Sequence, residues 1–369
     1  MKNKVLKYIL RTLLVIVVTL LLLFGIVYLT VYKIANGPSK SAKEVFVSTI
    51  LESGQLKFVA SWVCSKEEIQ EIVDRNTMKK MNTDIDESLI HIDNDENKSE
   101  RPSGNDDPGE TEEVFDENGI RIVEVSGPFY YGKMMIIKDP AQVVTGTSRV
   151  NGQWQTYGKD LEYLVKDNGA VAGVNGGIYV SKGNKGGSPL GVVVERGEIT
   201  FNSPTGLAGL YMIGFDNNNR LMIKDISGMN AAAFKDYVAE AGIRDAVAFQ
   251  EENTDANNHF VPLVINGEGR ELNGQGSGYN PRTAIGQRAD GAILLLVCDG
   301  RGASGHMGAS AADLIGKMLE FGAVNAANLD GGSSSTMYYN DHYEMTSVTF
   351  YYSNGSWKLP TSFVVMPKS

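Results

Sequence analysis

The sequence predicts a mixed α and β protein of the α+β class. We expect a large sheet-rich domain containing a strand-helix-strand unit, preceded by one transmembrane helix and a short helical stalk. Three observations predict this class. An uncharged apolar run of 21 residues lies close to the N-terminus. In addition, 36 of the 41 glycines fall within residues 119–369, which indicates many turns there. Short β-like runs recur in the same region, whereas helical patterns are fewer.

The apolar run extends from Thr12 to Tyr32 and is long enough, at about 1.5 Å per residue, to cross about 30 Å of hydrocarbon. It predicts one spanning helix over residues 12–32. Residues 1–11 are basic, which favours a cytoplasmic N-terminus and an extracellular C-terminal domain. The rival interpretation is a cleaved signal peptide, but the run is long for one and no clear small-residue cleavage site follows it. We therefore expect a single-pass anchor in the cell membrane.

Helical spacing at residues 41–52 and 66–76 predicts a helical stalk within residues 33–83, and Ser65 suits an N-cap. The next stretch, residues 84–118, contains 14 acidic and two basic residues and almost no apolar periodicity. This composition predicts a flexible acidic linker. A Ca2+ site is the alternative, but the acids do not follow the EF-hand pattern.

Residues 119–369 are the predicted main domain. The expected strands are Ile120–Glu124, Phe129–Ile137, Val171–Val174, Gly191–Val194, Leu207–Gly214, Arg220–Ile223, Ala246–Phe249, Ala292–Cys298, Ala323–Leu329, Met345–Tyr352 and Ser362–Met366. The clearer helical patterns are Lys159–Lys166, Ala231–Ala241 and Ala311–Phe321.

The most informative unit is strand, helix, strand over residues 292–329, because an aspartate directly follows each strand: Asp299 and Asp330. If the two strands are parallel neighbours, both carboxylates lie at one sheet edge, where open α/β sheets place ligands. A third predicted strand ends at Asn175, before Gly176 and Gly177. These strand ends are expected to converge.

Asp-Gly and Asn-Gly are also common turn dipeptides, so each signal alone is explained by a tight turn. Turn chemistry accounts poorly for Arg282, for Arg301 directly after Asp299-Gly300, and for the serines that begin at Ser333. Guanidinium groups bind phosphate through two hydrogen bonds, and amides flanked by glycine can approach an oxyanion closely. Together these residues predict an anion site.

At these positions the chain resembles the phosphodiester glycosidase family, and in particular its bacterial members of the exopolysaccharide-biosynthesis type. The matching segments, in the family's order, are Asn175–Gly177, Pro189–Gly191, Pro262–Gly267, Arg282–Gly286, Val297–Arg301 and Asn328–Met337. The resemblance covers most of residues 119–369. One departure is that the family's usual triple glycine after the second aspartate is here Gly331, Gly332 and Ser333.

The resemblance implies action on a sugar whose anomeric carbon is linked to a phosphodiester. Breaking that bond develops positive charge on the sugar and negative charge on the phosphate. We expect Asp330 to act as base or nucleophile, with Asp299 as the second carboxylate and Arg282 neutralising the phosphate. The residues expected to bind the substrate are Asn175, Gly176, Gly177, Arg301, Gly331, Gly332, Ser333 and His306. For His306, a mobile exposed side chain is the other interpretation.

The sequence therefore predicts a membrane-anchored extracellular hydrolase whose partner is a glycosyl phosphodiester or a cell-surface glycan. The alternatives are a surface protein that binds phosphosugars without turnover, and an enzyme that acts at phosphorus or transfers to an acceptor sugar. The net charge of −10 argues against nucleic acid as a partner. No cofactor is indicated with certainty, and Ca2+ or Mg2+ at the aspartates stays open. The oligomeric state is not predicted.

Overall fold

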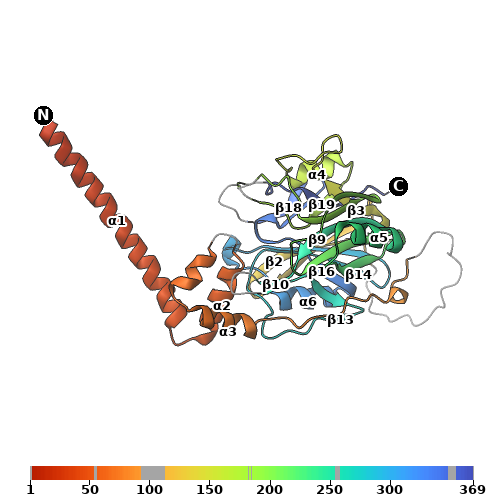
Figure 1. Ribbon diagram of the computed structural model, residues 1–369, viewed down its shortest axis with the longest axis horizontal. Helices are drawn as coiled ribbons and strands as arrows, with labels where there is room; N and C mark the ends of the chain where they lie inside the picture. The colour runs from red at the N-terminus through yellow and green to blue at the C-terminus, as the bar shows by residue number, and fades with distance from the viewer. Residues whose placement is uncertain are drawn as a thin grey trace.

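The computed structural model describes residues 2–53, 56–92, 113–181, 183, 185–253, 258–347 and 355–368. Most of the predicted acidic linker, and the C-terminal part of the predicted strand Met345–Tyr352, lie outside these residues. The described part is a mixed α+β structure with three main antiparallel sheets and a long apolar N-terminal helix (Figure 1). The predicted class is confirmed.

The N-terminal helix α1 spans Lys2–Asn36 and projects away from the sheets (Figure 1). Within the described residues, one helix is long and apolar enough to cross a membrane, over Lys4–Asn36. Such a helix is compatible with an anchor or with a signal sequence. After it come α2 (Lys40–Leu51), the 3-10 helix η1 (Lys57–Trp62), α3 (Lys66–Arg75) and the 3-10 helix η2 (Glu87–Leu89). At α3, Ser65 forms the predicted N-cap, with Glu68 completing a capping box.

The first sheet has seven strands in the order β1-β2-β15-β14-β16-β12-β13. Its strands are β1 (Ile120–Gly127), β2 (Tyr130–Ile137), β12 (Pro262–Ile265), β13 (Glu268–Gly269), β14 (Arg282–Arg288), β15 (Ile293–Cys298) and β16 (Ala323–Asn328). Helix α6 (Ala311–Glu320) connects β15 to β16 and packs on β12 and β16. Ser310 caps this helix in a capping box with Asp313.

One expectation about this sheet is wrong. The strands β15 and β16 run parallel, but they are not neighbours, because β14 lies between them and pairs antiparallel with both. The sequence analysis did not predict β14, because polar residues stand at both its ends and Gly286 interrupts its apolar pattern. That glycine has a packing role: a Cβ there would lie 3.1 Å from the sulfur of Met318 on α6. The helix can therefore cross closely over the middle strand.

Two smaller sheets complete the domain. The second has the order β18-β17-β4-β19-β3, and the third has the order β6-β5-β9-β7-β8. Their strands are β3 (Val143–Thr147), β4 (Ala172–Asn175), β5 (Gly191–Glu195), β6 (Glu198–Ser203), β7 (Leu210–Asp216), β8 (Leu221–Asp225), β9 (Ile243–Gln250), β17 (Thr336–Tyr339), β18 (His342–Thr346) and β19 (Thr361–Val365). A short pair, β10 (Glu252–Asn253) and β11 (Asn258–His259), lies apart from them. The remaining elements are α4 (Leu161–Asp167), α5 (Ala231–Ala241), η4 (Pro140–Gln142), η6 (Ala303–Gly305) and η7 (Gly332–Ser334).

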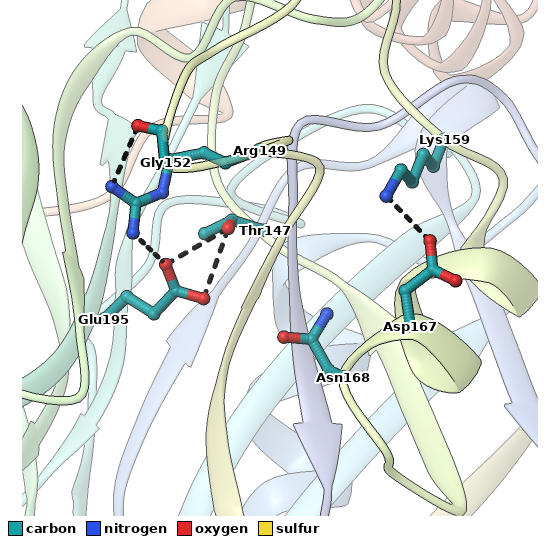
Figure 2. Close-up of a pocket in the computed structure, with 7 residues that line it drawn as sticks. All are labelled: Thr147, Arg149, Gly152, Lys159, Asp167, Asn168 and Glu195. Carbon is teal, nitrogen blue, oxygen red and sulfur yellow. Dashed lines mark hydrogen bonds and ion pairs between the residues drawn. The ribbon is translucent and has the colours of Figure 1, made fainter.

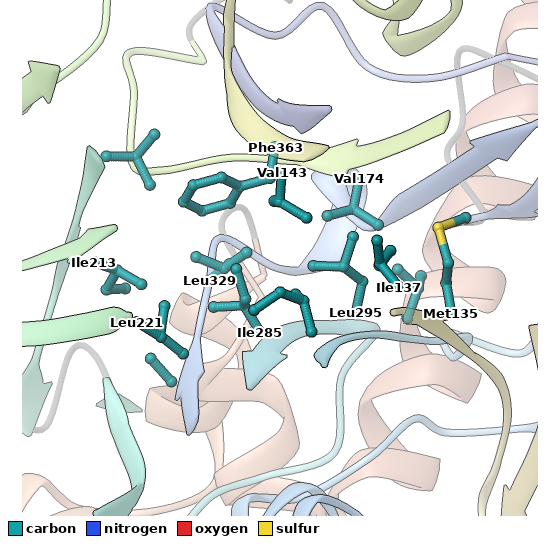
Figure 3. Close-up of a cluster of buried hydrophobic side chains, with 14 of the residues drawn as sticks. Met135, Ile137, Val143, Val174, Ile213, Leu221, Ile285, Leu295, Leu329 and Phe363 are labelled. Carbon is teal, nitrogen blue, oxygen red and sulfur yellow. The ribbon is translucent and has the colours of Figure 1, made fainter. Parts of the chain in front are cut away.

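The largest hydrophobic core cluster joins the three sheets. Figure 3 shows side chains of the first sheet facing Val174 and Phe363 of the second, with Ile213 of the third alongside. Leu329, directly after β16, is fully buried in this cluster. Burial of an apolar side chain of this size stabilises the fold by about 1.5–3 kcal/mol. The core thereby fixes the position from which the next residue, Asp330, leaves the sheet.

Candidate active site

The loops after β4 and β16 meet, although these strands belong to different sheets. The amide of Asn175 donates to the carbonyl oxygen of Asp330 over 2.6 Å, and the backbone N–H of Asp330 donates to the carbonyl of Gly176 over 3.3 Å. Two of the three predicted strand ends therefore touch directly. Asp299 follows β15, two strands away from β16, which at about 4.8 Å per strand separates the two backbones by about 10 Å.

Arg301 bridges the two aspartate loops. It adopts a left-handed backbone conformation, with φ of 56°. Its Nε donates to Oδ1 of Asn280 over 3.1 Å, and its Nη1 donates to Oγ of Ser333 over 2.7 Å. A Cβ on Gly332 would lie 2.5 Å from this guanidinium, so the glycine lets the bridge form. Arg301 is exposed and can offer its charge to an anion.

Asp330 is a carboxylate with a perturbed pKa. Burial raises the pKa of Asp330 to about 6, against the opposing effects of a Ser334 hydrogen bond, the Gly331 N–H and the charge of Arg301. The Gly331 N–H donates to Oδ1 over 3.0 Å, and the Tyr179 hydroxyl lies 2.9 Å from Oγ of Ser334. A carboxyl that titrates near neutral pH suits a general base.

Asp299 holds His306. Its Oδ1 accepts the backbone N–H of Tyr131 over 2.8 Å, and its Oδ2 lies 2.7 Å from Nδ1 of His306. The histidine is partly buried and held, in contrast to the interpretation of a mobile, exposed side chain. Because both carboxylate oxygens of Asp299 have partners, its geometry suits orienting the imidazole and leaving Nε2 available. No hydrogen bond between Asp299 and Asp330 occurs in the described structure; Arg301 connects their loops.

Arg282 lies at the start of β14, between the two aspartate loops, but its side chain is buried. Its Nη2 is 3.0 Å from Oε2 of Glu52 and donates to the carbonyl of Gly278 over 3.0 Å. Its guanidinium carbon stands 4.8 Å from the ring centre of Phe260. Only 3% of the residue is exposed, so Arg301, rather than Arg282, presents its charge to solvent.

The sequence did not identify Glu52 as a site residue. It follows α2 in the predicted stalk and is 6% exposed, and burial raises the pKa of its carboxyl above the usual range despite the nearby charge of Arg282. Ser48, one helical turn before Glu52, is also buried, but neither burial is visible in the sequence.

Asn175, Gly176 and Gly177 are buried at the base of the site. The side-chain oxygen of Asn175 accepts from Oγ1 of Thr283 over 2.7 Å and from the N–H of Thr336 over 3.2 Å. A Cβ on Gly177 would lie 2.3 Å from a backbone oxygen, so the glycine permits close strand packing. These three residues brace the loops, whereas Ser333 lies nearer the surface.

Among the described residues, no group of three or more His, Cys, Asp or Glu side chains is arranged to hold a metal ion.

A polar pocket of about 170 Å³ opens elsewhere, between the second and third sheets (Figure 2). None of the predicted site residues lines it. Its charged groups are already paired, with Arg149 2.9 Å from Glu195 and Lys159 2.7 Å from Asp167. The pocket therefore has no evident link to the aspartate loops.

Comparison with known proteins gives three kinds of similarity. Over 56 residues the chain is 45% identical to an uncharacterized prophage-derived protein of Bacillus subtilis, a match covering 15% of this chain and 8% of that protein. It is structurally similar to the zebrafish N-acetylglucosamine-1-phosphodiester alpha-N-acetylglucosaminidase catalytic domain auto-inhibited by its pro-peptide, at 18% identity, a TM-score of 0.47 and coverage of 68% and 82%. A hypothetical protein from Synechocystis is similar at 17% identity, a TM-score of 0.39 and coverage of 68% and 61%.

The sequence profile of the phosphodiester glycosidase family matches residues 168–366, which is more than half of the chain. The match includes both aspartate loops, Arg282 and Arg301. The protein belongs to the phosphodiester glycosidase family.

Proposed function

We propose that the protein is a membrane-anchored extracellular hydrolase that cleaves the glycosidic bond of sugar 1-phosphodiesters in a cell-surface polysaccharide or glycopolymer. Family membership supports the reaction class. One observation carries the assignment to this site: Asp330, whose pKa is raised to about 6, lies on the same loop as Ser333, which holds the exposed Arg301. The pair offers a base for water and a cation for phosphate.

In the proposed reaction, Asp330 takes a proton from water while the water oxygen bonds to the anomeric carbon. The bond from that carbon to the phosphate oxygen breaks, and its electron pair leaves with the phosphate monoester. Because this leaving group is a good one, it needs charge neutralisation more than a strong acid, and Arg301 supplies it. Arg282 is buried against Glu52 and donates to the carbonyl of Gly278, so its proposed role is to hold the neighbouring loop in place.

His306 is the proposed second acid and base group. With Nδ1 held 2.7 Å from Asp299, its Nε2 is free to exchange a proton with the departing phosphate oxygen. Asp299 then acts through the histidine, as a positioning residue. Asn175, Gly176 and Gly177 hold the loop of Asp330 in place, and Gly331, Gly332 and Ser333 shape the surface that the substrate meets.

The location rests on α1. Its apolar length suits one crossing of the membrane, and the basic residues before Thr12 favour a cytoplasmic N-terminus. A catalytic domain tethered in this way would meet its substrate at the cell surface.

The test compares the full-length protein with Asp330→Asn on a sugar 1-phosphate esterified to a small alcohol. Asp341→Asn is the matched control, because Asp341 lies on an exposed turn and pairs with Lys166. We expect release of free sugar by the wild type and the control, and loss of turnover in Asp330→Asn. Full activity in Asp330→Asn would refute the assignment of the base. Saturable binding without product, in the wild type, would instead identify a phosphosugar-binding protein.

A further inference from the structure

The end of α2 contacts the loop before β14, in which Gly278 accepts a hydrogen bond from Arg282 and Asn280 accepts one from Arg301. Gly278 N–H donates to Oε1 of Glu52 over 3.2 Å, and Tyr279 N–H donates to Oγ1 of Thr49 over 3.3 Å. A Cβ on Gly278 would lie 2.2 Å from the carbonyl oxygen of Ser48, so the helix and the loop pack backbone to backbone. Figure 1 shows α2 beside the sheet domain, at the base of α1.

Two separate paths lead from Glu52 to the arginines. Its carboxylate pairs with Arg282 over 3.0 Å, with only 1% of the Glu52 side chain and 4% of the Arg282 side chain exposed. Its carbonyl oxygen accepts from Nδ2 of Asn280 over 3.4 Å, and Oδ1 of the same asparagine accepts from Nε of Arg301 over 3.1 Å. One residue of the N-terminal segment thus contacts Arg282 directly and Arg301 through a single bridge.

We propose that Glu52 is a positioning residue of the active site: it balances the buried charge of Arg282, holds Arg301 in place for phosphate through Asn280, and so sets the net charge around Arg301. The segment between the apolar helix and the sheets is then a working part of the site. This inference rests on the proposed function. It deepens that function because phosphate recognition becomes dependent on a residue outside residues 168–366, which the family profile matches.

The buried pair explains why the role falls to a carboxylate. A guanidinium buried without a partner is strongly destabilising, and a flexible one would lose its fixed donor directions. With Glu52 present, the charge of Arg282 is balanced. The positive charge that the site presents to solvent is then that of Arg301. Removing the Glu52 charge leaves the positive charge of Arg282 uncompensated near Arg301, which it repels.

The test is Glu52→Gln in the full-length protein, with Glu44→Gln as the matched control. Glu44 lies on α2, which Glu52 directly follows, but it pairs with Arg75 over 2.9 Å. Two quantities are measured: kcat and KM on the sugar phosphodiester as a function of pH, and the Kd of ethyl phosphate by calorimetry. Ethyl phosphate is a minimal model of the leaving group, and its binding requires no turnover.

We expect Glu52→Gln to raise KM and the Kd of ethyl phosphate by about tenfold or more, since the contacts of the carboxylate with Arg282 and with the Gly278 N–H lose their charge assistance, although the backbone carbonyl still accepts from Asn280. The acid limb of the pH profile should move to lower pH, because added positive charge favours ionised Asp330. A purely structural role would reduce the folded fraction without moving that limb. Glu44→Gln should match the wild type.

Other outcomes overturn the inference. If Glu52→Gln behaves like Glu44→Gln, the contacts of Glu52 contribute packing only. If Glu52→Gln instead raises kcat/KM or tightens ethyl phosphate binding, the segment around Glu52 inhibits the site. Should Glu52→Gln fail to fold, Asn280→Ala decides, because it breaks the bridge to Arg301 without removing a charge: weaker ethyl phosphate binding supports the inference, and unchanged binding contradicts it. A wild type that binds ethyl phosphate without turnover would refute the proposed function, while the effect on Kd still decides the role of Glu52.

Discussion

Asp330 is the residue at which fold and chemistry are most directly linked. The buried Leu329 fixes where the chain leaves β16, and the next side chain enters a desolvated position beside Ser334 and Arg301. Desolvation disfavours the charged carboxylate, whereas the proposed base must be charged to accept a proton. The hydrogen bonds and the guanidinium offset part of that penalty.

The pH profile is the first prediction at this scale. With the pKa of Asp330 raised to about 6 in the free protein, kcat/KM should fall about tenfold per pH unit below that value. Ser334→Ala removes a hydrogen bond that lowers this pKa, so its acid limb should lie at higher pH than that of the wild type. The measurement is kcat/KM against pH for both proteins. Superimposable limbs would show that another group controls the profile.

Stability gives a second prediction for the same residue. The folded pKa of about 6 exceeds the unfolded value of about 3.9, so the ionised carboxylate destabilises the folded state above pH 6. Asp330→Asn should therefore raise the free energy of unfolding at neutral pH, by up to about 3 kcal/mol. This advantage should shrink as pH falls from about 6 to about 4, where the wild-type carboxyl is protonated in both states.

Urea unfolding of both proteins at about pH 7.5 and about pH 4.5 tests this prediction. Equal stabilities at the higher pH would contradict the desolvated carboxylate.

At the scale of elements, Asn175 at the end of β4 ties strands from two sheets together. Its side chain bonds to Thr283 on β14, to Thr336 on β17 and to the carbonyl of Asp330 after β16. Asn175→Ala leaves these buried groups without partners and should destabilise the fold by about 2–4 kcal/mol. Because the loop of Asp330 loses its anchor, kcat should also fall in the folded fraction.

Chemical denaturation and kcat measured well below the unfolding transition test this brace. Asn168→Ala is the control, since Asn168 donates to a carbonyl of the helix that it caps, that of Leu164. If Asn175→Ala retained both the stability and the kcat of the control, the brace would have no functional role.

The sequence was informative about elements wherever apolar residues ran together. The buried strand before Asp299 and the capped helix α6 were predictable, because continuous apolar residues and a Ser310 capping box identify them locally. The middle strand β14 was not, because its polar ends and Gly286 are stabilised by pairing on both sides. The order of strands is set by these long-range pairings, so the spacing of the two aspartates could not be read from local patterns.

Motif chemistry predicted Asp330 and Arg301 as site residues, and both remain proposals, but it gave no information about which arginine is buried. Glu52 was missed because its importance arises from a contact with Arg282 across 230 positions of the chain. A single polar residue after a helix carries no local sign of such a partner. Long-range ion pairs of this kind depend on tertiary packing.

At the scale of the whole molecule, the aromatic side chains of η1 lie against α1. The ring centres of Trp62 and Phe24 are 5.6 Å apart, and those of Trp62 and Phe58 are 5.3 Å apart. Phe58 is 52% exposed, and Trp62 is 37% exposed. If α1 is a membrane anchor, these rings are positioned for the interface between lipid and water, where such side chains are favoured.

Fluorescence quenching tests this placement. In vesicles containing brominated lipid, the full-length protein should lose part of its tryptophan emission, and Trp62→Phe should abolish most of that loss. The other two tryptophans, Trp154 and Trp357, belong to the sheet domain and serve as internal controls. Equal quenching in both proteins would place Trp62 outside the interface, whereas absence of the protein from the vesicles would argue against the anchor itself.

The most direct test of the central claim follows the oxygen atom of water. The wild type is incubated with a simple sugar 1-phosphodiester in water labelled with a heavy oxygen isotope, and both products are analysed by mass spectrometry. Attack at the anomeric carbon, assisted by Asp330 and Arg301, predicts the label on the released sugar. Label on the phosphate would show cleavage at phosphorus and contradict the account.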